Sequence, residues 1–212
     1  KPLCVLMLPL ILLLMEPDFG SLVVLSCTFM AMLFLTGIKL WHYFGLVFAG
    51  SSVLAIFAEA APYRMARLSS FLDPWSDQFN SGYQLTQSLI AFGRGEWFGV
   101  GLGQSVQKML YLPEAHTDFV FAIFAEEFGF VGSLFLLILY ALVIIISLMI
   151  AVNCRSMFSK LMVIGIVAIL FSHVFINIAM VMGLLPAVGV PLPFISYGGT
   201  MMVSMLIGFG LV

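Results

Sequence analysis

Hydrophobic segments recur along the chain at the length and spacing of membrane-crossing helices. Six apolar segments alternate with short polar breaks and with one long polar stretch at about residues 59–118. A helix needs about 20 apolar residues to cross the hydrocarbon of a bilayer, and the second to fifth segments are long enough. Backbone polar groups at that depth must be hydrogen-bonded locally, so helices are predicted. The predicted spans are residues 3–15, 19–38, 41–58, 130–152, 161–184 and 195–212, with residues 119–129 leading into the fourth.

The basic residues outside the long polar stretch predict the orientation of these spans. Lys1 precedes the first span, Lys39 lies between the second and third, and Arg155 and Lys160 lie between the fourth and fifth. If the spans alternate in direction, all four residues fall on one side, which the positive-inside rule assigns to the cytoplasm. The long loop at 59–118 is then predicted to face outward.

Composition narrows the class of protein. Hydrophobic residues make up 63% of the 212-residue chain and charged residues only 8%, whereas a soluble domain carries about 25% charge. This excludes a soluble enzyme, a disordered chain and a nucleic-acid-binding protein with a basic surface. We predict an all-α polytopic membrane protein. Because the chain begins at Lys1 and ends inside an apolar run at Val212, we interpret it as part of a longer protein.

The outward stretch holds most of the charge and several patterns of its own. Twelve of the charged residues lie between Glu59 and Glu127. Leu85, Leu89 and Phe92 have the spacing of one helix face, so residues 81–92 are predicted to form a helix that Gly93 ends. The glycine-rich run at 99–103 could cradle a phosphate with backbone N–H groups, but a flexible turn is the favoured interpretation.

A concentrated polar motif stands where this loop returns to the membrane, at residues 111–119. Asp118 lies nearest the apolar run, where a low dielectric would favour its neutral form and allow it to act as a general base. Alternatively, Asp118 and Thr117 could cap the helix that begins at Phe119. From the residues alone both interpretations stay open. Glu126 and Glu127 lie farther in and are interpreted as interfacial, with at least one of them hydrogen-bonded structurally.

Two features of the C-terminal half are interpreted structurally. His173 and Asn177 share a helix face, and hydrogen bonding between helices is the favoured role. The connection at 183–200 contains three Pro and repeated Gly but almost no charge, so it is predicted to be a re-entrant or broken-helix element packed against protein.

Four motifs give the chain a specific resemblance over its whole length. They are EPDFG at 16–20, SGYQ and QS within 81–88, LPEAHTDF at 112–119 followed by EE at 126–127, and PLPFISYGG at 191–199. With them the chain resembles the SEDS family of bacterial shape, elongation, division and sporulation proteins. The residues at 94–96 and 105–108 are more similar to the division member than to the elongation member. Thr200 and Glu16 depart slightly from the family pattern, and both keep a polar group.

The resemblance implies a fold, an activity and partners. It implies ten transmembrane helices, of which this chain would supply the last six within a single transmembrane domain (1–212) with a large extracytoplasmic loop at about 59–118. It implies a peptidoglycan glycosyltransferase that polymerises lipid II at the outer face of the bacterial cytoplasmic membrane, at the division septum. A class B penicillin-binding protein, other division membrane proteins and membrane lipid are the implied partners, and nucleic acid is not. The family's essential aspartate falls on Asp118.

The remaining site residues follow from this expectation. Asp118 would take a proton from the acceptor hydroxyl, and Arg64, Arg67 and Lys108 would meet the charge of the leaving pyrophosphate, with a divalent cation such as Mg²⁺ or Mn²⁺ as a further option. The candidate substrate-binding residues in the shared motifs are Glu114, His116, Thr117, Ser196 and Tyr197. A flippase for the same lipid, an elongation polymerase and a non-catalytic scaffold are the alternatives.

Overall fold

The chain folds as helices. The computed structural model describes residues 9, 12–13, 19–59, 71–76, 79–80 and 82–212, and every regular element with complete bounds in these ranges is helical, which confirms the predicted all-α class. Most of the first predicted span, residues 3–15, lies outside the described residues, and of the motif at 16–20 the structure describes Phe19 and Gly20. The elements are α2 (Phe19–Leu35), α3 (Leu40–Glu59), α5 (Tyr83–Gly95), the π-helix η1 (Gln107–Tyr111), α6 (Val120–Asn153), α7 (Met157–Val181) and α8 (Gly199–Gly210).

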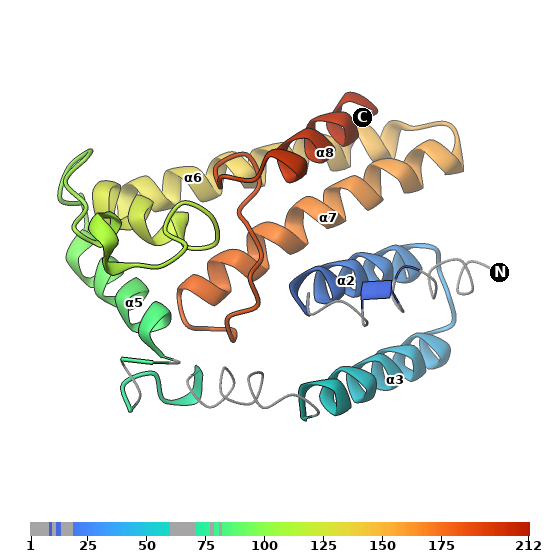
Figure 1. Cartoon of the computed structure of the whole chain (residues 1–212). Coiled ribbons are helices and arrows are strands. Elements are labelled where there is room, and N and C mark those ends of the chain that lie inside the picture. Colours follow the sequence, from blue (N-terminus) through green and yellow to red (C-terminus); the bar gives the residue numbers. More distant parts are fainter. Residues whose placement is uncertain (1–8, 10–11, 14–18, 60–70, 77–78, 81) are drawn as a thin grey trace.

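Two of these helices, α6 and α7, are long and apolar enough to cross a membrane by length and composition. The helices α2 and α8 are also apolar but shorter. In Figure 1, α6 and α7 lie side by side along the long dimension of the molecule, α8 runs beside them, and α2 packs on α7 with α3 outside it. The core of the molecule is therefore the α6–α7 pair.

The ends of α7 differ from the predicted span of 161–184. The helix begins at Met157 because Ser156 caps it, accepting a hydrogen bond from Ser159 N at 3.1 Å. It ends at Val181 because Gly183, at φ 72°, reverses the chain: Gly183 N donates to Met180 O and Leu184 N to Ala179 O. This is the Schellman arrangement, which glycine adopts without a Cβ clash.

A break at Gly129 divides α6 where the predicted lead-in ends and the predicted span begins. Gly129 has φ 67° and ψ −165°, so the residues on either side do not form one continuous hydrogen-bonded helix. The break leaves the amides of Phe130 and Val131 without acceptors inside the helix. They bond instead to the loop after α5, with Phe130 N donating to Glu96 O and Val131 N to Trp97 O. The membrane-crossing part of α6 is therefore the part after Gly129, while the turns before it face the loop.

The connection between α7 and α8 is re-entrant, as predicted. In Figure 1 it turns back along α7 from one end of the molecule and reaches the start of α8 near the middle. Tyr140, in the membrane-crossing part of α6, donates from its hydroxyl to Pro193 O. Val190 and Leu192 are buried. An irregular, uncharged backbone at this depth is thus packed against protein and hydrogen-bonded to it.

The helix predicted at 81–92 is present as α5, but Gly93 does not end it. The helix continues to Gly95 and the backbone turns at Glu96, where φ is 44°. Gly95 is buried against α6, where a Cβ would come within 2.1 Å of Ala125 O. Close packing on α6 therefore carries the helix past the first glycine. Of the predicted stripe, Leu85 is buried, while Leu89 and Phe92 are half-buried.

The connections fall at two opposite ends of the molecule. In Figure 1 the α2–α3 connection, which carries Lys39, lies at the right-hand end together with the α6–α7 connection, which carries Arg155. The helix α5 and the loop that follows it lie at the left-hand end. The basic connections therefore share one end, and the polar motifs of the long stretch occupy the other.

Candidate active site

The motif at 112–119 is held by its apolar members. Leu112, Ala115 and Phe119 are buried in the largest hydrophobic cluster, together with residues of α6 and α7. Of the residues between them, Pro113, Glu114 and His116 are exposed, while Thr117 and Asp118 are half-buried. The apolar positions therefore fix the segment on the helices while its polar side chains face away from the core.

A tight turn at Glu114 joins two of the predicted substrate-binding residues to each other. Glu114 has φ 53°, and its carbonyl accepts from Thr117 N and Phe119 N, both at 3.2 Å. The Thr117 hydroxyl donates to Glu114 Oε2 at 2.6 Å. The N-cap position of α6 is Phe119, which makes no side-chain capping bond. The Thr117 hydroxyl proton is thus used within the turn.

The backbone carbonyls of three consecutive residues, His116, Thr117 and Asp118, are each held by a different donor. Tyr197 N donates to His116 O at 2.8 Å, and the Ser196 hydroxyl donates to Thr117 O at 2.6 Å. The Asn177 side chain donates to Asp118 O at 2.7 Å. The motif at 191–199 and helix α7 therefore hold the loop motif directly, although they are distant from it in sequence.

A pocket of about 480 Å³ opens beside this contact. Three of the predicted site residues, His116, Ser196 and Tyr197, line it. Tyr197 is 82% exposed, whereas Ser196 is buried and its hydroxyl also accepts from Leu192 N. The other lining residues are Val120, Ile195, Gly198, Gly199 and Met202. The structure brings these residues together, and their role in binding stays a prediction.

Asp118 is half-buried at the edge of this assembly. Its carboxylate lies toward the α7–α8 connection, since a Cβ built on Gly189 would be 3.4 Å from Asp118 Oδ2. Both the backbone and the side chain of Asp118 thus lie against the re-entrant segment. The motif at 191–199 contacts the loop motif at the two preceding residues, His116 and Thr117.

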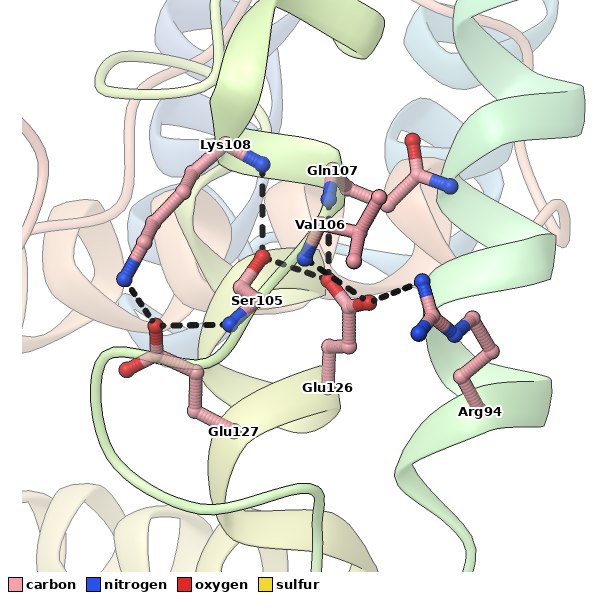
Figure 2. Close-up of polar contacts among 7 residues, drawn as sticks. All are labelled: Arg94, Ser105, Val106, Gln107, Lys108, Glu126 and Glu127. Atoms are coloured by element: carbon pink, nitrogen blue, oxygen red, sulfur yellow. Dashed lines mark hydrogen bonds and ion pairs between the residues drawn. The ribbon is translucent and has the colours of Figure 1, made fainter.

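The second cluster of charge surrounds Glu126, on the turns of α6 that precede Gly129 (Figure 2). Glu126 is fully buried and accepts from the Ser105 hydroxyl, Val106 N and Gln107 N. Arg94 Nη1, on α5, lies 3.2 Å from Glu126 Oε1, the oxygen that also accepts from Val106 N. A buried carboxylate is tolerated when ion pairing and hydrogen bonds replace its hydration. The prediction of a hydrogen-bonded structural role for at least one of these glutamates is confirmed.

Lys108 belongs to the same cluster. Its ammonium lies 2.7 Å from Glu127 Oε1, and Ser105 N donates to that same oxygen at 3.4 Å (Figure 2). The lysine side chain is 28% exposed. Lys108 therefore has a carboxylate partner within the protein, and its predicted contact with pyrophosphate stays a prediction. Arg64 and Arg67, the other two predicted cations, lie outside the described residues.

The glycine-rich run at 99–103 is a turn docked on the break in α6. Val100 N donates to Glu126 O at 2.9 Å and Gly101 N to Glu127 O at 3.1 Å. These two carbonyls are the ones that Phe130 N and Val131 N would occupy in a continuous helix. The amides of Val100 and Gly101 therefore bond to protein carbonyls, in agreement with the favoured interpretation as a turn.

Two contacts of the site could not be assigned from the sequence. The pairing of Arg94 with Glu126 joins α5 to α6, and the bond from Asn177 to Asp118 joins residues 59 positions apart. The signal available for Asn177 was its polarity within an apolar helix, which predicts a hydrogen-bond partner without identifying it.

Comparisons with known proteins agree with the motifs. The model of the cell cycle protein family that includes FtsW, RodA and SpoVE matches residues 1–212. The probable peptidoglycan glycosyltransferase FtsW of Legionella pneumophila is 53% identical over 206 residues, which cover 96% of this chain and 52% of the relative. That of Saccharophagus degradans is 52% identical over 216 residues, covering 100% of this chain and 54% of the relative. The chain therefore spans about half the length of the curated relatives it matches.

Solved structures show the same fold. A chain from a study of the structural coordination of polymerization and crosslinking by a peptidoglycan synthase complex superposes with a TM-score of 0.80 at 28% identity, covering 99% of this chain and 59% of that one. The rod shape-determining protein RodA of Thermus thermophilus superposes with a TM-score of 0.65 at 26% identity, covering 100% and 53%. The chain belongs to the FtsW/RodA/SpoVE family of cell cycle proteins, which are polytopic membrane proteins.

Proposed function

We propose that the full-length protein is a peptidoglycan glycosyltransferase that polymerises lipid II at the outer face of the cytoplasmic membrane during cell division. The observation that carries the proposal is the similarity to relatives named FtsW, which reaches about half identity over nearly the whole chain, against 26% for RodA of Thermus thermophilus. This difference favours the division role over the elongation role. Lipid II and the septal location belong to the proposal.

The site supports a substrate that is polar at one end and a lipid at the other. Ile195 lines the pocket that contains His116 and Tyr197, and it also lines a second, apolar pocket of about 200 Å³. That second pocket is formed with Leu136, Leu139, Tyr140, Val143 and Phe194, at the level of the membrane-crossing part of α6. A sugar pyrophosphate near Tyr197 could thus extend its isoprenoid tail toward α6.

Asp118 is the proposed general base. Its carboxylate takes the proton from the 4-hydroxyl of the acceptor sugar as that oxygen bonds to the anomeric carbon of the donor. The bond from the anomeric carbon to the pyrophosphate breaks, and undecaprenyl pyrophosphate leaves with the electron pair. Inverting glycosidases add a second carboxyl group to protonate a sugar leaving group, whereas pyrophosphate leaves as an anion, so one carboxylate is sufficient for this displacement with inversion. The hydrogen bond that holds its backbone carbonyl and the closeness of its carboxylate to Gly189 support the role, since a general base must be held in a fixed direction.

The partner is proposed to be a class B penicillin-binding protein that cross-links the new strands. The structural likeness to a chain from a peptidoglycan synthase complex that combines polymerization with crosslinking supports this. Pull-down of the full-length protein with such a transpeptidase from its own division complex tests the pairing.

Replacing Asp118 with asparagine tests the catalytic assignment. Asn has the same shape but cannot accept the proton, so polymerisation of purified lipid II by the full-length protein should fall about 10²- to 10⁴-fold. Glycan chains resolved by gel electrophoresis give the measurement. Asp73→Asn is the matched control, because Asp73 is an exposed carboxylate of the same long loop, and it should keep full activity.

Normal polymerisation by the Asp118→Asn protein would overturn the assignment of the base. Vesicles reconstituted with the unaltered protein distinguish the flippase alternative, which requires lipid II to cross the bilayer without being polymerised. A division complex that assembles and functions with the asparagine variant would instead favour the scaffold.

A further inference from the structure

Asn177 is a fully buried amide on α7, four residues before the helix ends. Its Nδ2 atom lies 2.7 Å from Asp118 O and 2.6 Å from Val190 O. Because carbonyl oxygens only accept hydrogen bonds, these two contacts fix which end of the amide is nitrogen. Both amide hydrogens are used, and each is used on the backbone of a different segment.

The two carbonyls belong to Asp118 and to the segment that approaches its carboxylate. One is the backbone of Asp118 itself. The other is Val190, next to Gly189, whose Cα approaches Asp118 Oδ2 so closely that an added Cβ would be 3.4 Å away. Asn177 is thus the common donor that keeps the Asp118 backbone and the Val190 backbone at a fixed separation.

Two other bonds of the loop motif come from a different segment. Tyr197 and Ser196 hold the carbonyls of His116 and Thr117, but both donors come from the re-entrant segment itself. Asn177 is a side chain of a long membrane helix, packed in the α6–α7 core. It therefore ties Asp118 to a buried position of helix α7.

We propose that Asn177 is a positioning residue for Asp118. By holding Asp118 O and Val190 O, its side-chain amide sets the direction of the carboxylate toward the acceptor hydroxyl. The inference rests on the proposed function. Because Asn177 acts through Asp118 and not on the substrate, its loss should lower kcat and leave KM nearly unchanged. A displacement of about 1 Å in a reacting group can cost about 10²-fold in rate.

The test uses the full-length protein and purified lipid II, with kcat and KM measured separately. Asn177→Leu keeps the shape of the side chain and removes both donors, so kcat should fall about 10- to 100-fold with KM within about twofold. Asn177→Ser keeps one donor and is smaller, so it should fold readily and lose less kcat. Monodisperse elution in detergent verifies the fold of each variant.

Ser88→Ala is the matched control. The Ser88 hydroxyl is buried and donates to Val181 O at 2.6 Å, so it also joins α7 to another segment at the same end of the helix, but it does not touch Asp118. This control should lower thermal stability and leave kcat unchanged. A fall in kcat with Ser88→Ala as large as that with Asn177→Leu would mean that general loosening, not positioning, explains the effect.

The outcomes separate the two proposals. If Asp118→Asn is inactive while folded Asn177→Leu and Asn177→Ser keep normal kcat, the positioning inference is wrong and the base assignment stands. If Asp118→Asn polymerises normally, the base assignment is wrong and the positioning inference is overturned with it. A rise in KM with unchanged kcat in the Asn177 variants would also contradict the inference, since it would indicate a substrate contact.

Discussion

The Ser196 hydroxyl connects two motifs that are 79 residues apart. It accepts from Leu192 N at 2.7 Å and donates to Thr117 O at 2.6 Å. A hydroxyl has one proton, so the bond to Thr117 leaves none for a substrate. Ser196 lines the pocket, but its hydroxyl oxygen is already hydrogen-bonded to Leu192 N and Thr117 O, and these bonds join the re-entrant turn to the loop motif.

Ser196→Ala should therefore destabilise the protein. The change leaves Leu192 N and Thr117 O without this partner, and a buried polar group that loses its hydrogen bond costs about 1–3 kcal/mol. The melting temperature of the full-length protein in detergent should fall. Ser204→Ala is the matched control, because the exposed Ser204 hydroxyl bonds only to Thr200 O of its own helix. Equal melting temperatures for the two variants would contradict the prediction.

The sequence predicts that certain polar residues form hydrogen bonds, but it does not identify their partners. Glu126 among apolar residues had to be hydrogen-bonded, and Asn177 in an apolar helix had to find a polar contact. Which groups satisfy them depends on how distant segments pack. The Ser105–Gln107 turn and the Asp118 backbone are not neighbours of these residues in the chain. Tertiary contact, not local pattern, decides the pairing.

At the scale of elements, hydropathy located the helices better than it located their ends. The α7 helix begins at Met157, ahead of the charged Lys160, because Ser156 caps it. A hydropathy pattern marks where the apolar run starts, whereas a helix starts at its cap. The division of α6 at Gly129 was visible as a change of composition, whereas the bonding of the Phe130 and Val131 amides to the carbonyls of residues 96 and 97 was not.

The Lys108–Glu127 pair offers a test of what the loop cation does. If Lys108 serves mainly to anchor the loop on α6, then Lys108→Met and Glu127→Gln should each lower the melting temperature. The double variant should lose less unfolding free energy than the two single variants lose together. The difference, which is the coupling energy of the pair, should be about 1 kcal/mol or less because the pair is partly exposed. KM for lipid II should stay nearly unchanged.

Lys39→Met, an exposed lysine at the opposite end of the molecule, is the control for loss of charge alone. A KM that rises in Lys108→Met and does not recover in the double variant would instead support the predicted contact between Lys108 and pyrophosphate. Additive effects on stability would mean that the pair contributes no coupling.

For the whole molecule, the order of the helices could be predicted and their packing could not. The α6 and α7 helices are apolar along nearly their whole length, so periodicity does not indicate which face of one meets the other. The re-entrant 183–198 connection was predictable because proline, glycine and a lack of charge are incompatible with a solvated loop. Its contacts with Tyr140 and Asn177 required the packed structure.

The placement of the connections at two ends makes the predicted orientation testable. Lys39 and Arg155 share one end, which the positive-inside rule assigns to the cytoplasm, and the loop with Leu102 lies at the other. Native Cys154 sits beside Arg155, so it reports on the first end, and the 76% exposed Leu102 suits a cysteine that reports on the second. Each probe is placed in a full-length protein that has no other cysteine.

A membrane-impermeant maleimide applied to intact spheroplasts should label Leu102→Cys and leave Cys154 unmodified. Permeabilisation should then expose Cys154 as well, which verifies that its thiol can react. Labelling of Cys154 but not of Leu102→Cys in intact spheroplasts would mean that the chain has the opposite orientation. Asp118 would then face the cytoplasm, where it could not act on a precursor at the outer face. Because Asp118 lies at the same end as the loop, this single labelling pattern decides whether the proposed polymerase site can face its substrate.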